Sequence, residues 1–222
     1  MTTPKQKLDQ LEEYIREFVP DYERKIKDES KLMKFFNFFA KIFNDRFMDG
    51  YITTIYPKVY WPRGSERNSN EVFWTTAHEA VHLLSAKKKT PFVHTFLYGF
   101  PQWLTLLAFL SLGAIWGGKL WLLNLLWLLC LAPLPAPFRM AEEKLAYTMS
   151  MAVYYWRWEN VPDAYVNHLA TQFYTAKYYF MWPFKKSIIK ALHKQKDKIV
   201  AGKYDNDPLF ARVKAILKEE LE

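Results

Sequence analysis

Two histidines and a glutamate form the most informative short pattern in this chain: His78, Glu79 and His82, in the segment HEAVH. Residues four apart on a helix lie on one face about one turn from each other, so both imidazoles can bind the same metal ion. Glu79 directly follows the first histidine and is placed to take a proton from a metal-bound water. This HExxH pattern predicts a hydrolytic zinc site.

The surrounding residues predict a helix over Asn70–Ala86. Ser69 or Asn70 can cap its first turn. Apolar residues recur there at helical spacing: Val72, Phe73, Ala77, Ala80, Val81 and Leu84. His78 and His82 lie beside this apolar stripe, as partly buried ligands would. The alternative is a chance match on a surface helix with two solvated histidines.

A catalytic zinc site needs a third protein ligand and one open position. The segment FRMAEEKLAY, which begins a helix predicted from Phe138 to about Trp158, offers Glu142 and Glu143. Glu143 is the better candidate, because the small Ala146 lets two helices approach closely and Arg139 can orient the carboxylate from outside the ligand set. Glu142, about 100° round the helix, is expected on a solvated acidic face. Metal binding by Glu142 instead remains the alternative.

The best strand candidate is Tyr51–Trp61, rich in β-branched and aromatic residues. Pro57 restricts it to an edge, since proline cannot donate to a strand ladder. An edge strand just before the metal-binding helix can pair with an extended substrate through residues 55–60. The alternative is a short strand that only completes a small sheet.

The other segments are predicted to be helical. Residues 1–50 are expected to form amphipathic N-terminal helices, one over residues 5–29 interrupted near Pro20 and one over Lys31–Phe47. The second is basic and rich in phenylalanine, which suits a membrane interface and equally suits packing on a core. Three further helices are expected: from Pro162 to about Phe180, from Trp182 to about Val200, and from Asp207 through Leu221.

From Thr90 to Phe138 the only charged residue is Lys119. Two apolar segments flank the pair Gly117-Gly118: Pro101–Trp116 and Leu120–Leu131. The first, extended back to Phe92, is long enough to cross a bilayer as one helix, whereas prolines end the second too early. We therefore expect a hydrophobic helical hairpin at about 92–137, inserted in the lipid bilayer. A buried hairpin in a soluble core is the alternative.

The flanks of this hairpin predict its orientation. Lys87, Lys88 and Lys89 precede it, and Arg139 and Lys144 follow it. Positive charge on both sides favours the cytoplasmic side for both ends, and with them for the HExxH helix.

Composition narrows the class of protein. The 222 residues include seven glycines and few strand-like runs, so we expect a mainly α fold with a minor α+β contribution. The net charge of +8 suits an anionic membrane surface, and without a nucleic-acid-binding motif we expect no nucleic-acid partner. The single cysteine, Cys130, excludes an internal disulfide and suits a reducing compartment. The polar N-terminus predicts no cleavable signal peptide.

The pattern His78-Glu79-x-x-His82 followed by Glu143-x-x-Ala146 resembles the zincin metallopeptidases with a glutamate third ligand. It is similar to membrane-bound members such as the CAAX prenyl protease and HtpX-type families, and to small bacterial and phage proteins of HExxH type. The resemblance covers roughly residues 51–158. Where the prenyl-protease pattern ends in aspartate, this chain has Tyr147.

The resemblance implies a zinc-dependent endopeptidase with ligands His78, His82 and Glu143 and catalytic Glu79, acting on a peptide or protein. It implies a zincin-like helical core within residues 51–222, interrupted by the hairpin. Tyr147 and His168 are the candidate donors to the oxyanion of the reaction, although each can be structural instead. Two other functions stay open: a non-catalytic membrane-binding protein, and a zinc hydrolase acting on a non-peptide bond. The sequence makes no prediction of the oligomeric state.

Overall fold

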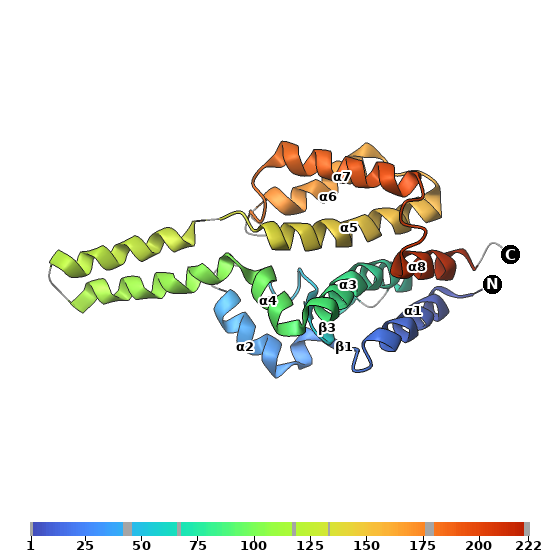
Figure 1. Ribbon diagram of the computed structural model, residues 1–222. Coiled ribbons are helices and arrows are strands. Elements are labelled where there is room, and N and C mark those ends of the chain that lie inside the picture. The colour runs from blue at the N-terminus through green and yellow to red at the C-terminus, as the bar shows by residue number, and fades with distance from the viewer. Residues whose placement is uncertain are drawn as a thin grey trace.

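The computed structural model describes residues 2–41, 46–65, 68–116, 119–132, 134–175 and 180–219. It consists mainly of helices with one small sheet, so the predicted mainly α fold is confirmed (Figure 1). Helices α3 (Ser69–Lys89) and α5 (Pro137–Trp158) pack against each other at the centre. These are the two helices that the sequence predicts to carry the metal ligands.

Helices from both ends of the chain pack around this pair. Helix α1 (Pro4–Phe18) packs on α3, and α6 (Asp163–Tyr174) and α7 (Lys185–Val200) pack on each other and on α5. Helix α8 (Pro208–Lys218) contacts both α5 and α1. Their apolar faces form one buried cluster that includes Leu11, Ile15, Leu83, Ala146, Met151 and Val213. Removing these side chains from water supplies the main stabilisation of the arrangement.

Local sequence signals set the ends of the two central helices. The side chain of Asn68 accepts a hydrogen bond from the backbone N–H of Asn70 at 3.1 Å, so α3 is capped by Asn68 and not by either predicted candidate, Ser69 or Asn70. Helix α5 begins at Pro137, a residue suited to the first turn because it lacks an N–H. It ends at Trp158 and is followed by Glu159, which has a left-handed φ of 54°.

The sheet differs from the sequence prediction. It has three strands, β1 (Glu23–Ile26), β2 (Thr53–Ile55) and β3 (Lys58–Trp61), in the order β1-β3-β2, with β3 parallel to β1 and antiparallel to β2. The prediction of one edge strand over Tyr51–Trp61 was therefore wrong. Pro57 lies in the turn that splits the segment into β2, which is an edge strand, and β3, which is the central strand of the sheet. Strand β1 lies where a helix was expected.

Helix α2 (Lys31–Ala40) is shorter than the predicted helix over Lys31–Phe47, of which residues 42–45 lie outside the described residues. Met33 is its fully buried side chain, while Phe35 and Phe38 are 60% and 74% exposed. In the described part of the chain, the phenylalanine face of α2 is therefore largely exposed at Phe35 and Phe38.

The hydrophobic hairpin begins with a bend. Helix α4 (Pro91–Gly99) is followed by the 3₁₀-helical segments η3 (Gln102–Trp116) and η4 (Lys119–Leu131). The last two run side by side and extend away from the other helices (Figure 1). The expected single helix from Phe92 to Trp116 was wrong, because Pro101 cannot continue α4.

Length and apolar composition determine whether a helix of the hairpin could cross a lipid bilayer. Within the described residues, no single helix is long and apolar enough to cross a bilayer. The pair formed by α4 and η3 up to Gly113 passes that test together, with a bend of 66° between them.

Candidate metal centre

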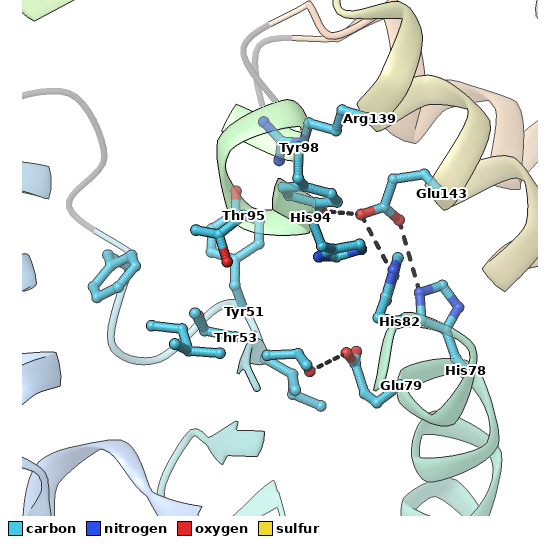
Figure 2. A pocket seen from close by; sticks show the side chains of 14 residues that line it. Tyr51, Thr53, His78, Glu79, His82, His94, Thr95, Tyr98, Arg139 and Glu143 are labelled. Carbon is cyan, nitrogen blue, oxygen red and sulfur yellow. Dashed lines mark hydrogen bonds and ion pairs between the residues drawn. The ribbon is translucent and has the colours of Figure 1, made fainter. Parts of the chain in front are cut away.

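Three predicted ligands meet between α3 and α5. His78 Nε2 lies 3.7 Å from Glu143 Oε2, and His82 Nε2 lies 3.8 Å from Glu143 Oε1 (Figure 2). Two atoms bound to one tetrahedral zinc ion at 2.0–2.1 Å are about 3.4 Å apart. The observed spacings therefore need to shrink by only a few tenths of an ångström, and the three side chains can hold one metal ion.

The hydrogen bonds of His78 favour the ring form that binds metal. Ser150 Oγ donates to the carbonyl of Ala146, and it lies 3.0 Å from Nδ1 of His78. With the serine hydrogen directed at Ala146, Ser150 Oγ is placed to accept the Nδ1–H of the imidazole, and the carbonyl of Ala146 is a second acceptor for His78. In the neutral ring the lone pair is then on Nε2, which faces Glu143. A partner on the second nitrogen is typical of metal-binding histidines.

Charge keeps the third ligand ionised. Burial opposes ionisation of Glu143, but His82, His78 and Arg139 outweigh burial and lower its pKa to about 2. Burial lowers the pKa of His82. Burial alone would also lower the pKa of His78, but the carboxylates of Glu143 and Glu79 outweigh burial, so that the pKa of His78 is raised. A metal ion binding here would displace any proton held between His78 and Glu143.

Glu79 faces the same cavity as the three ligands. Its Oε2 accepts a hydrogen bond of 2.6 Å from Thr54 Oγ1 on β2. The cavity has a volume of about 290 Å³ and lies between α3, α4, α5 and β2 (Figure 2). Besides His78, Glu79, His82 and Glu143, its lining residues are Phe47, Tyr51, Ile52, Thr53, Thr54, Ile55, His94, Thr95, Tyr98 and Arg139.

Tyr98 is a cavity residue that sequence reasoning missed. Its hydroxyl donates a hydrogen bond to Oε1 of Glu143, and its ring packs edge-on against His82 with centroids 5.9 Å apart. Arg139 lines the cavity too, with its guanidinium carbon 5.1 Å from the centre of the Tyr98 ring. The usable signal was the pair His94 and Tyr98, two polar side chains four apart on an apolar helix.

The two predicted oxyanion donors do not reach the cavity. Tyr147 is buried and packs its ring on His78, at a centroid distance of 4.8 Å, and on Phe173. His168 is exposed on α6. Neither lines the cavity. Tyr147 therefore packs against the candidate ligand His78 without lining the cavity. His168 lies on the face of α6 opposite its buried residues.

Glu142 was expected on a solvated face, and that expectation was wrong. The residue is buried, Lys89 Nζ donates to its Oε1, and His94 Nε2 lies 3.6 Å from its Oε2. Burial disfavours its charge, but His94, Lys89 and Ser85 lower its pKa to about 2. The cause is α4, which turns back after α3 and covers this side of α5.

The site therefore combines a buried group of two histidines and a glutamate with a second glutamate facing the same cavity. Comparisons of the chain with protein-family models, with curated proteins and with solved structures found no match. The chemistry of the site is accordingly argued from its own residues.

Replacing Ser150 by alanine tests the orientation of His78. We expect Ser150→Ala to lower the zinc affinity roughly 10–100-fold, because the imidazole loses the acceptor that fixes its ring form. Competition with a fluorescent chelator measures the change. Thr148→Ala is the matched control, since Thr148 also donates to a carbonyl of α5 (that of Lys144, at 2.7 Å). Equal affinities of Ser150→Ala and wild type would contradict this role.

Proposed function

We propose that the protein is a membrane-associated, zinc-dependent metallopeptidase of zincin type. The observation that carries the proposal is the convergence of His78, His82 and Glu143, with Glu79 in the same cavity. Two imidazoles and one carboxylate are a common ligand set of catalytic zinc and leave a fourth position for water. Hard ions such as Mg²⁺ or Ca²⁺ prefer oxygen ligands alone, so the donor set favours zinc.

Zinc in such a site lowers the pKa of a bound water and polarises a carbonyl group. Glu79 would act as the general base that accepts the water proton and then delivers it to the leaving amine. The hydrogen bond from Thr54 holds the Glu79 carboxylate at the cavity wall. The Tyr98 hydroxyl, already next to Glu143, would donate to the developing oxyanion.

A peptide substrate is supported by strand β2. Thr53, Thr54 and Ile55 line the cavity, and β2 is an edge of the described sheet, with β3 on its other side. An edge strand offers backbone N–H and C=O groups to an extended chain, which adds to the sheet as a further strand. A peptide bound in this way would pass directly beside Glu79.

Replacing Glu79 by glutamine separates catalysis from metal binding. We expect Glu79→Gln to retain zinc at the wild-type stoichiometry and to cleave about 10²–10⁴-fold more slowly, because the amide cannot accept the water proton. Metal analysis and turnover of a library of internally quenched peptides measure the two effects. Glu71→Gln, an exposed position on the same helix, is the control and keeps full activity. A Glu79→Gln protein that cleaves at the wild-type rate would refute this mechanism.

Tyr98→Phe tests the oxyanion donor. We expect kcat to fall about 10²–10³-fold with KM nearly unchanged, since the lost hydrogen bond forms chiefly in the transition state. Steady-state kinetics on the best peptide of the library, with zinc content measured in parallel, provide the readout. Tyr165→Phe on α6 is the control and leaves both constants unchanged. If Tyr98→Phe lowers zinc content but not kcat per bound zinc, Tyr98 only positions Glu143.

Membrane association is supported by uncovered apolar surface. On α4, η3 and η4, residues such as Phe92 (81% exposed), Leu106, Phe109, Ile115, Leu123 and Leu129 face outward. Contiguous apolar surface of this kind marks a site of association with lipid or protein. Because α4 carries Tyr98 and also leads into the hairpin, an inserted hairpin would hold the cavity near the lipid surface. The basic flanks favour the cytoplasmic side.

Deleting the hairpin tests this part of the proposal. We expect the full chain to stay in the membrane pellet after an alkaline carbonate wash. A variant with residues 102–131 replaced by a short Gly-Ser linker should be released, because the main apolar surface is removed. The deletion spares Tyr98, so the released protein should still bind zinc, which checks that it is folded. Release of the full chain by carbonate would contradict membrane insertion.

A further inference from the structure

A second group of potential metal ligands lies next to the first. His82 on α3, His94 on α4 and Glu142 on α5 bring one ligand atom each to within 4.8 Å of one another. Within this group, His94 Nε2 lies 3.6 Å from Glu142 Oε2. Three helices that are separate in the sequence therefore converge on this point.

The polar atoms of this group are buried without hydrogen-bond partners. His82 Nδ1, His94 Nε2 and Glu142 Oε2 are each enclosed and lack a hydrogen bond to a described residue; the last two face each other, but at 3.6 Å they are too far apart for one. Buried nitrogen and oxygen atoms ordinarily have a partner, because desolvation without compensation costs a few kcal/mol each. Three such atoms in one cluster indicate a shared ligand rather than three separate defects of packing.

The chemistry of the group indicates a cation. Lys89 forms an ion pair with Oε1 of Glu142, which favours the carboxylate form, and the other oxygen, Oε2, faces His94. Oε2 thus remains available as a negative ligand beside two imidazoles. Imidazole nitrogen suits first-row transition ions such as Zn²⁺, Co²⁺, Ni²⁺ and Cu²⁺ better than Mg²⁺ or Ca²⁺.

We propose that His82, His94 and Glu142 form a second binding site for a divalent transition-metal ion, and that this site shares His82 with the first. Nε2 of His82 faces Glu143, which leaves Nδ1 for the second ion. A neutral imidazole carries one N–H, so His82 serves both ions at once only after releasing that proton to solvent. For this reason, and because Lys89 offsets part of the Glu142 charge, the second ion binds more weakly than the first.

Cobalt titration of the full-length protein in detergent tests the proposal. The protein is stripped of metal, titrated with Co²⁺, and followed by equilibrium dialysis with metal analysis and by the visible ligand-field spectrum. Wild type should bind two equivalents, one tight and one weak. His94→Ala and Glu142→Gln should each lose the weak equivalent and keep the tight one. Glu143→Gln should weaken the tight equivalent instead.

His193→Ala provides the matched control, because His193 on α7 pairs with Asp163 away from the cavity. It should still bind two equivalents. A single equivalent in wild type would overturn the proposal, as would two equivalents in both His94→Ala and Glu142→Gln. The outcome is independent of peptidase activity: two equivalents in a protein that cleaves no peptide would refute the proposed function and leave the second site standing.

Discussion

The close packing of α3 on α5 is the constraint on which the rest of the structure depends. It places an ionised glutamate between two imidazoles in a space from which water is largely excluded, an arrangement that is costly unless each group is compensated. Small side chains permit the approach, since Ala77, Ala80 and Ala146 are fully buried. The apolar faces of α1, α6, α7 and α8 then hold the pair together from outside. Loosening any of these contacts would separate Glu143 from His78 and His82.

Helix α4 joins this pair to the hairpin. Thr90 ends α3 and precedes α4 with a φ of 67° and a ψ of 142°, a backbone conformation that residues other than glycine rarely adopt and that costs about 1–3 kcal/mol. The turn redirects the chain so that α4 lies against α5 and covers Glu142. It also directs Tyr98 at Glu143 and His94 at Glu142. The hairpin is therefore attached directly to the site, and a shift of the hairpin base would move two of its side chains.

The sequence was most informative where the signal is local. The spacing of His78 and His82 follows from helical periodicity, and the helix around them lies as expected with a slightly earlier cap. Glu143 could also be chosen, because the chain must return from the hairpin and Ala146 marks the face that approaches α3. What failed depends on contacts between distant segments. The burial of Glu142 and the position of Tyr98 both require the turn at Thr90. No residue pattern in the sequence predicts that turn.

The sheet shows the same limit. The run of β-branched and aromatic residues around Pro57 was predicted as one strand, although it contains a turn. Composition alone cannot distinguish one long strand from two short strands joined by a turn. Strand β1 exists because β3 pairs with it in parallel, residue 23 with 58 through 26 with 61. Its sequence, ERKI, has no strand pattern of its own. That pairing matters to the site, because β1 and β3 support the edge strand β2, whose Thr54 holds Glu79.

Energetics give a reason to assign function to these polar side chains. Apolar residues at positions 78, 82, 142 and 143 would pack α3 on α5 without desolvating charge, and such replacements are often neutral or stabilising. The chain instead buries the carboxylates of Glu79, Glu142 and Glu143 together with His82, and places His78 and His94 beside them. A polar interior of this kind brings no gain in folding. Binding and chemistry are the functions that require it.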